Sequence, residues 1–252
     1  MELKTLLISQ ARMGSSRLPG KVLKEVNSLP LLKIHLDRIS NCKNVDKIIV
    51  ATTTSDADDI LVEKVLKWGY EVVRGSENDV LDRYFQAAKA LSPEWVVRVT
   101  SDCPLIDPLM IDKIIEETII AKKDYGSNGL NECYPDGQDV EVFTFEALEF
   151  AWNNAVKKSD REHVTTFIRN NSDLCNGSIF KSYSLPCVGD FSKIRMTVDE
   201  ELDFQLIEII IKNLGINKTW EEYTNYIIEN DLLKINSEIK RNEGLQNSIK
   251  ND

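Results

Sequence analysis

The sequence predicts an α/β protein built on an open, mostly parallel, Rossmann-like sheet, and three observations support this. The chain has 252 residues, a length that suits one domain or one domain with an inserted lobe. Hydrophobic residues make up 42% of it, enough for a sizeable core. Through roughly the first 120 residues, short β-rich runs alternate with helical patterns, which is typical of a parallel sheet with helices on both faces.

The strands and helices of this first part can be placed in order. Apolar runs bounded by polar residues predict strands at Thr5–Ser9, Lys47–Thr52, Glu71–Arg74 and Trp95–Thr100. Residues that commonly open or cap helices predict helix starts at Pro30, at Asp56, at Asn78 or Asp79, and at Asp107 with Pro108. Ligands bind beyond the carboxyl ends of such strands, so loops 10–21, 52–56, 74–79 and 101–107 should surround one crevice.

The second part of the chain is less regular. Residues 124–138 are rich in Gly, Asn, Asp and Pro and are expected to form a loop. Strands are expected at 140–145, 178–184 and 194–198, and helices at 145–157, 161–171 and 200–214. The polar residues 235–252 are expected to be a frayed tail. We therefore expect one domain over residues 1–234, divided into halves 1–123 and 124–234.

Charge and cysteine content exclude several classes of protein. The net charge of −10 disfavours binding to a nucleic-acid backbone, which needs a basic face. Five scattered cysteines without a CxxC pair, together with only two histidines, fit a reducing compartment and no structural zinc. The chain lacks the long apolar runs of a signal peptide or membrane span. We expect a cytoplasmic protein with no membrane partner.

The most informative motif is the segment Ala11–Lys21, directly after the first predicted strand. It places Arg12, Arg17 and Lys21 within ten residues, among glycines and serines that allow a tight turn. A turn of this kind at the end of a strand is suited to cradling a triphosphate. It is neither a Walker A loop nor a GxGxxG turn. The alternative interpretation is a solvated basic turn.

Two aspartates also stand at predicted strand ends. Asp102 follows the strand Trp95–Thr100, where a carboxylate can hold Mg²⁺ against phosphate oxygens. Asp199 follows the predicted strand 194–198 and would be a second metal ligand if that strand returns to the crevice. Both residues could instead cap a turn or a helix.

Several weaker signals concern the nucleotide and the second substrate. Arg74 lies at the end of the third strand, where binding and turn roles are equally plausible. In the alternating segment Gly137–Val142, Asp139 and Glu141 share a face and could bind sugar hydroxyls, or could simply be solvated. Arg161 and His163 open a later helix and are further candidates.

With these motifs in hand, the sequence resembles the cytidylyltransferases that make CMP-activated acidic sugars. The resemblance covers about residues 5–210 and is greatest to the subgroup of spore coat polysaccharide biosynthesis protein F. Four segments carry it, namely Gln10–Leu23, Arg74–Tyr84, Arg98–Pro108 and Asp160–Val164. Where octulosonate enzymes have Gln-Gly-Asp-Glu-Pro, this chain has Thr100-Ser-Asp-Cys-Pro104.

The resemblance implies a fold of the nucleotide-diphospho-sugar transferase (glycosyltransferase-A) type, with CTP, Mg²⁺ and a sugar acceptor as ligands. Arg12, Ser16, Arg17 and Lys21 match the family's triphosphate loop, and Asp102 and Asp199 match its two metal-binding aspartates. We expect catalytic roles for Arg17, Lys21 and Asp102. The expected nucleotide-binding residues are Ala11, Arg12, Met13, Gly14, Ser16, Thr52, Arg74, Asn78 and Thr100. The expected sugar-binding residues are Gln138, Asp139, Glu141, Arg161 and His163, in a half (124–234) that is also the candidate dimerisation region.

The expected activity is transfer of CMP from CTP to an acidic sugar, of the nonulosonic or octulosonic type, with release of pyrophosphate for surface polysaccharide or glycan synthesis. Catalysis would consist mainly of positioning and charge neutralisation. One alternative is a glycosyltransferase of the same fold, although its usual Asp-x-Asp is absent after Trp95–Thr100. Another alternative is a non-catalytic nucleotide- or sugar-binding module. Because dimers are common among the relatives, a homodimer is an open expectation.

Overall fold

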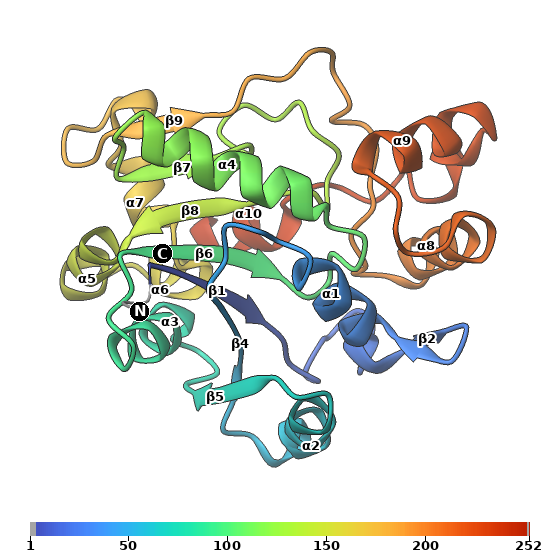
Figure 1. Ribbon diagram of the computed structural model, residues 1–252, viewed down its shortest axis with the longest axis horizontal. Coiled ribbons are helices and arrows are strands. Elements are labelled where there is room, and N and C mark those ends of the chain that lie inside the picture. Colours follow the sequence, from blue (N-terminus) through green and yellow to red (C-terminus); the bar gives the residue numbers. More distant parts are fainter. Residues whose placement is uncertain (1–3, 251) are drawn as a thin grey trace.

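A mixed seven-stranded sheet organises the chain in the computed structural model, which describes residues 4–250 and 252 (Figure 1). The strand order is β5-β4-β1-β6-β8-β7-β9. Its parallel part comprises β1 (Thr5–Gln10), β4 (Lys47–Thr53), β5 (Glu71–Gly75) and β6 (Trp95–Thr100). The remaining strands are β8 (Glu141–Thr144), antiparallel to β6, then β7 (Tyr125–Ser127) and β9 (Ser182–Ser184). The predicted fold class is confirmed.

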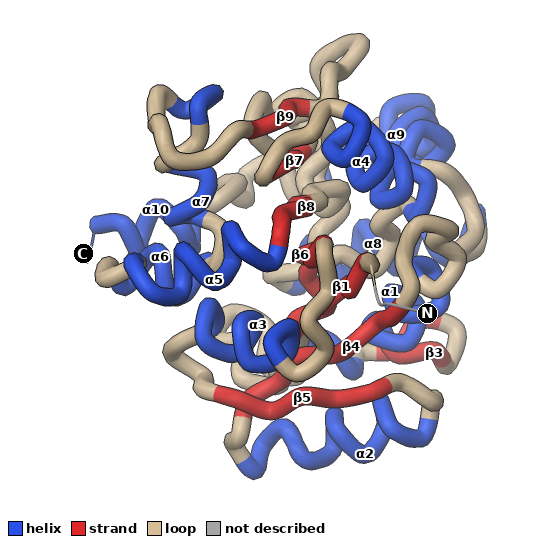
Figure 2. Tube along the Cα trace, turned by 60° about the vertical axis from the view of Figure 1, so that its left-hand side comes forward, coloured by secondary structure: helices blue, strands red, loops and turns tan. Residues whose placement is uncertain are grey.

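Helices cover both faces of the sheet, because alternate residues of the central strands point to opposite sides. Leu7 of β1 packs with α1 (Leu31–Ile39), α2 (Asp59–Lys67) and α4 (Pro108–Ile120). Its neighbours Leu6 and Ile8 pack on the other side. That second core is completed by α3 (Val80–Lys89), α5 (Phe145–Asn154) and α7 (Thr166–Asn170). Figures 1 and 2 show α4 and α3 on opposite sides of the strands.

A third apolar cluster stands beside the sheet and supports one wall of the crevice. It joins α8 (Glu201–Leu214) and α9 (Trp220–Glu229) to the extended segment 194–198 and to the start of α1. The small hairpin of β2 (Glu25–Val26) and β3 (Leu29–Pro30) packs there too. Short 3₁₀ turns at Lys21–Leu23, Asp56–Asp58, Asp173–Cys175 and Leu232–Ile235 complete the connections.

Several predicted elements differ from the structure. Residues 194–198 form no strand but an extended segment with one bridge, between Asp136 and Arg195. Strand β7 lies in the expected loop 124–138, because three residues are too few to show a period. The expected helix 161–171 is divided into α6 (Lys158–His163) and α7, because Val164 adopts a positive φ of 63°. Helix α9 was not predicted.

The polar end of the chain also differs from the expected frayed tail. Residues Glu243–Lys250 form α10, which lies against α6 in both Figure 1 and Figure 2. Glu243 and Ser248 of this helix, and Arg241 and Asn242 just before it, contact residues far away in the sequence, which explains why the sequence pattern did not reveal its order.

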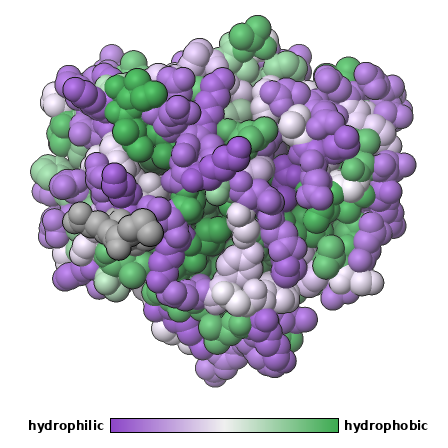
Figure 3. Space-filling model, in the orientation of Figure 1, coloured by the Kyte–Doolittle hydropathy of each residue, from purple (hydrophilic) through white to green (hydrophobic). Residues whose placement is uncertain are grey.

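The surface seen in Figure 3 is mostly hydrophilic, with separate small hydrophobic patches. No helix within the described residues is both long and apolar enough to cross a membrane.

One buried histidine ties α1 to the loop that follows β6. His35 is fully buried, with Nε2 2.9 Å from the Ser9 hydroxyl and Nδ1 2.9 Å from the Cys103 carbonyl oxygen. Burial lowers the pKa of His35 to about 4, despite the nearby Asp102. The imidazole is therefore neutral in the folded protein at neutral pH, and it holds the turn that carries Asp102.

This burial makes a prediction about stability and pH. The unfolded chain takes up a proton on this histidine near pH 6.5, whereas the folded protein does so only near pH 4. The free energy of unfolding should thus fall by about 3 kcal/mol as the pH drops through this interval. Urea unfolding of the wild type and of His35→Asn at both ends of the interval measures it. A wild-type slope that persists unchanged in His35→Asn would contradict the assignment.

Candidate active site

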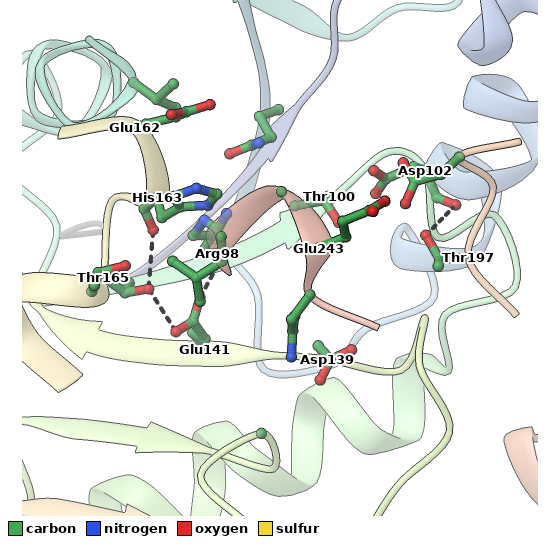
Figure 4. A pocket seen from close by; sticks show the side chains of 18 of the residues that line it. Arg98, Thr100, Asp102, Asp139, Glu141, Glu162, His163, Thr165, Thr197 and Glu243 are labelled. Atoms are coloured by element: carbon green, nitrogen blue, oxygen red, sulfur yellow. Dashed lines mark hydrogen bonds and ion pairs between the residues drawn. The ribbon is translucent and has the colours of Figure 1, made fainter. Parts of the chain in front are cut away.

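A large pocket of about 1630 Å³ opens at the carboxyl ends of β1 and β6. Paired strand positions set its base, because Gln10 at the end of β1 lies opposite Thr100 at the end of β6. Its walls come from the loop after each of these strands, from segment 195–199, from α6, and from residues 240–249 (Figure 4). The pocket therefore lies where the predicted crevice was expected.

The loop Ala11–Lys21 folds back on itself through backbone hydrogen bonds. The Met13 carbonyl accepts from the N–H groups of Ser15 (2.9 Å) and Gly20 (3.1 Å), and Gly20 takes a left-handed φ of 68°. The Met13 N–H donates to Asp58, 2.7 Å away, which also accepts from Thr52 and Thr53. This closed turn leaves the side chains of Arg12, Arg17 and Lys21 along the pocket wall.

Lys21 stands at the centre of the charged half of the pocket. Its Nζ lies 3.2 Å from Asp102 Oδ2 and 2.8 Å from Asp199 Oδ1, and only 11% of the side chain is exposed. Burial opposes the ammonium, but the two carboxylates outweigh it and keep the pKa of Lys21 above its usual value. Conversely, burial by itself would raise the pKa of Asp102, but the positive charge of Lys21 outweighs this effect and lowers the pKa of that carboxyl to about 2. Lys21 and Asp102 are therefore both charged at neutral pH.

Arg17 extends this charged cluster toward solvent. Its guanidinium lies 3.1 Å from Asp199, 3.5 Å from Glu200 and 3.4 Å from Glu243. Arg12, further along the loop, pairs with Glu77 at 3.2 Å. Each cation of the loop is thus matched to a carboxylate of the chain.

Segment 194–198 brings Asp199 to this cluster without being a strand. The Val198 N–H donates to the Asp102 carbonyl (2.7 Å), and the Met196 N–H donates to the Asp136 carbonyl (2.7 Å). The close approach at Asp136 depends on Gly137, which has a φ of +100° and where a Cβ would lie 2.7 Å from the Met196 backbone.

A buried ion network then fixes the carboxylate of Asp199. The Arg195 guanidinium binds Asp199 Oδ2 at 2.9 Å, Asp203 at 2.9 and 3.1 Å, and Asp136. Asp203 is fully buried at the start of α8 and accepts from the Asp199 N–H and from Asn236. Arg195 and Asp203 are positioning residues for Asp199, because they hold both its backbone and its side chain.

The carboxylate pair is chemically suited to a divalent cation. Two carboxylates that already share one cationic atom are donors that Mg²⁺ uses, with phosphate oxygens and waters completing its shell. Among the residues described, no group of three or more His, Cys, Asp or Glu side chains could hold a metal alone. Asp102 and Asp199 could therefore supply two of the ligands of a divalent cation, and the remaining ligands would have to come from elsewhere.

The other half of the pocket is built around Glu141. Its carboxylate binds Arg98 (2.6 Å) and accepts from the hydroxyls of Tyr125 (2.7 Å) and Thr165 (2.6 Å) (Figure 4). Burial opposes its ionisation, but Arg98 outweighs it and lowers the pKa of Glu141. His163 also lines this half, and burial lowers its pKa. Asp139 lies nearby and pairs with Arg241 at 2.7 Å.

The structure brings most of the predicted site residues to the pocket. Its lining includes Ala11, Arg12, Ser16, Arg17, Lys21, Asn78, Thr100, Asp102, Asp139, Glu141, Arg161, His163 and Asp199. Arg161 has a structural task as well, because it binds Asp79 and the Trp152 carbonyl and so ties α6 to α3.

Five predicted residues lie outside the lining. The Thr52 hydroxyl is buried and donates to Asp58, and Arg74 binds Thr53, Ser55 and Asp59 at the far side of β4. Gln138 is buried and bridges the Asp107 N–H and the Leu105 carbonyl. Met13 closes the loop through its backbone N–H and carbonyl, and Gly14 follows it in the same turn. These residues position the site rather than face it.

The charged lining residues that the sequence analysis did not name as site residues include Arg98, Arg195, Arg241 and Glu243. Arg98 interrupts an otherwise apolar strand, and Arg195 stands four residues before Asp199, so both carried a signal. Arg241 and Glu243 carried none, since they lie in a polar segment without a pattern.

The fold and this cationic loop facing a carboxylate pair define a nucleotidyltransferase-type α/β protein. The cytidylyltransferase family profile matches residues 6–232, and the chain belongs to this family. An uncharacterised protein of Methanocaldococcus jannaschii is 39% identical over 95% of this chain and 97% of its own. Spore coat polysaccharide biosynthesis protein SpsF of Bacillus subtilis is 34% identical over 83% of this chain and 87% of its own.

Solved structures agree with this assignment. A cytidylyltransferase from Leptospira borgpetersenii has a TM-score of 0.85 and 29% identity, covering 96% of this chain and all of its own. A CMP:2-keto-3-deoxy-manno-octonic acid synthetase solved with CTP shares the fold, with a TM-score of 0.59 and 15% identity over 83% of this chain and 98% of its own.

The buried network beneath Asp199 predicts a large effect of one substitution. Asp203→Asn should lower the free energy of unfolding by about 3 kcal/mol, because it removes the fully buried carboxylate among the three that pair with Arg195 and sets an amide NH2 against groups that donate to Asp203. Asp231→Asn is the matched control, since its pair with Lys234 is largely exposed and should change stability by less than about 1 kcal/mol. Chemical unfolding measures both. Equal stability of the two variants would contradict the network.

Proposed function

We propose that the protein transfers CMP from CTP to an acidic sugar and releases pyrophosphate. The single observation that carries this proposal is the placement of Lys21 between Asp102 and Asp199, with Arg17 beside them. Both cations belong to the loop Ala11–Lys21, through which the sequence resembles the family. In this arrangement, Lys21 and Arg17 can exchange the carboxylates for phosphate oxygens. The two carboxylates can then bind a divalent cation in place of Lys21.

In the proposed reaction, Arg17 and Lys21 bind the triphosphate and neutralise charge that develops on the leaving pyrophosphate. An acceptor hydroxyl attacks the α-phosphorus in line, so that an O–P bond forms as the bond to the β-phosphate oxygen breaks and the hydroxyl proton is released. No protein nucleophile is required. Burial keeps the pKa of Cys103, the thiol next to Asp102, well above its usual value, so it stays protonated.

Mg²⁺ is part of the proposal. When bound, it would supply Lewis-acid stabilisation of the phosphate oxygens. Asp102 and Asp199 would hold it, and Arg195 would keep Asp199 oriented toward it.

The acceptor is proposed to occupy the half of the pocket around Glu141, Asp139 and His163. An acidic sugar is supported by relatives such as a 3-deoxy-manno-octulosonate cytidylyltransferase of Hydrogenovibrio crunogenus, 37% identical over 45% of this chain and 46% of its own. The solved complex of a structural neighbour with CTP supports the nucleotide. All five cysteines are free thiols, which supports a reducing, cytoplasmic location.

The nucleotide part of the proposal is tested by thermal shift against CTP, UTP, GTP, ATP and nucleotide sugars, each with and without Mg²⁺. We expect the largest stabilisation with CTP and Mg²⁺, about 2.7 kcal/mol at a hundred times the dissociation constant. Stabilisation by nucleotide sugars and not by any triphosphate would favour a glycosyltransferase instead.

The catalytic part makes a separate prediction. Asp102→Asn should reduce pyrophosphate release from CTP, in the presence of octulosonic and nonulosonic acid acceptors, by at least about a hundredfold, because one of the two charged carboxylates is lost. Asp56→Asn, exposed and outside the pocket lining, should retain wild-type activity. A coupled pyrophosphate assay measures both. Full activity of Asp102→Asn would contradict the mechanism.

A further inference from the structure

The C-terminal residues 240–250, which we name the C-terminal strap, run across the whole pocket. They follow Asn236, which is buried beneath Arg195 and Asp203. The family profile ends at residue 232, before the strap begins. All but two of its residues line the pocket. The strap is thus one wall of the space in which the proposed nucleotide and sugar would bind.

On the acceptor side, the strap is fastened by polar side chains. Arg241 binds Asp139 (2.7 Å) and the Tyr134 carbonyl (3.0 Å), and its side chain is only 14% exposed. Asn242 donates to Glu132 at 2.8 Å, and Ser248 binds Glu162 of α6. The Ser248 contact joins α10 (Glu243–Lys250) to α6, against which it packs, and the other contacts fix the segment just before α10.

On the phosphate side, the strap offers a carboxylate to the triphosphate loop. Glu243 Oε2 lies 3.4 Å from Arg17 Nη1. Figure 4 shows the side chain of Glu243 inside the pocket, between Asp102 on one side and Glu141 on the other. A carboxylate at Arg17 stands where the proposed function places an oxygen of the triphosphate.

We propose that Glu243 is a built-in competitor of the triphosphate, and that the strap must leave Arg17 before CTP can bind. This inference rests on the proposed function only for the identity of the nucleotide, because any polyphosphate that binds Arg17 would meet the same competitor. Residue 243 thus sets nucleotide affinity, and the strap couples the phosphate half of the pocket to the acceptor half through Arg241.

The ion pair between Arg17 and Glu243 is weak enough to break and form again reversibly. The Arg17 and Glu243 side chains are 35% and 46% exposed, and such an ion pair is weak in water. A triphosphate brings several negative charges to Arg17, Lys21 and Arg12 together, so it should displace a single carboxylate. Two further carboxylates, Asp199 and Glu200, face Arg17 from the loop before α8 and remain in place.

The first test compares two variants of the full-length chain. Glu243→Gln should bind CTP and Mg²⁺ about two- to fivefold more tightly than the wild type, because it removes the competitor but keeps the shape of the side chain. Glu238→Gln is the matched control, since Glu238 is exposed in the same part of the chain, lies outside the pocket lining, and changes the net charge equally. Calorimetry with CTP and, separately, with inorganic tripolyphosphate gives the dissociation constants.

The second test follows the strap itself. Hydrogen exchange of the backbone amides in α10 should become faster when CTP or tripolyphosphate saturates the protein, while exchange in α8 stays the same. Slower or unchanged exchange in α10, or a Glu243→Gln affinity equal to or weaker than that of Glu238→Gln, would overturn the inference.

The outcomes also separate this inference from the proposed function. A wild type that binds tripolyphosphate but not CTP would contradict the proposed nucleotide, and the strap would still be judged from tripolyphosphate. A wild type that binds neither would overturn both, because Arg17 would then have no polyphosphate for Glu243 to exclude.

Discussion

The ammonium of Lys21, held between Asp102 and Asp199, is the interaction on which the site depends. Asp102 follows the end of β6 and Asp199 precedes α8, so the two carboxylates come from segments far apart in sequence. Like charges this close would repel each other in a buried setting without a cation between them. Lys21 removes that repulsion in the free protein. In the proposed complex, the divalent cation that accompanies the triphosphate would take over the same task, which links the stability of the pocket to its proposed chemistry.

The remainder of the fold keeps this cluster in place from below. His35 supports the turn that carries Asp102, and Asp58 anchors the loop Ala11–Lys21 through the Met13 N–H. Arg195 and Asp203 fix Asp199. Because each of these supporting side chains is buried, thermal motion displaces it little. The contact on the solvent side, from Arg17 to Glu243, is exposed and weaker, as expected for a group that exchanges partners during binding.

The sequence predicted the parallel half of the sheet well because buried strands and capped helices leave strong local patterns. Trp95–Thr100 and the cap at Asp107 agree with the structure residue for residue. It could not predict that Gln138 turns inward, since its hydrogen bond to the Asp107 N–H joins segments distant in the chain, and the inward turn of Thr52 toward Asp58 leaves no mark in a strand pattern. The same holds for residues 235–250. They carry few apolar side chains, and their order comes from ion pairs and hydrogen bonds across the pocket.

The central claim is that Lys21 serves the carboxylate pair in the free protein and the triphosphate in the complex. Calorimetric titration of Lys21→Met with CTP and saturating Mg²⁺ tests it most directly, with Lys24→Met as control, because Lys24 pairs with Glu201 outside the pocket. The account predicts that Lys21→Met binds CTP at least about tenfold more weakly, while Lys24→Met binds like the wild type. Wild-type affinity in Lys21→Met would contradict it.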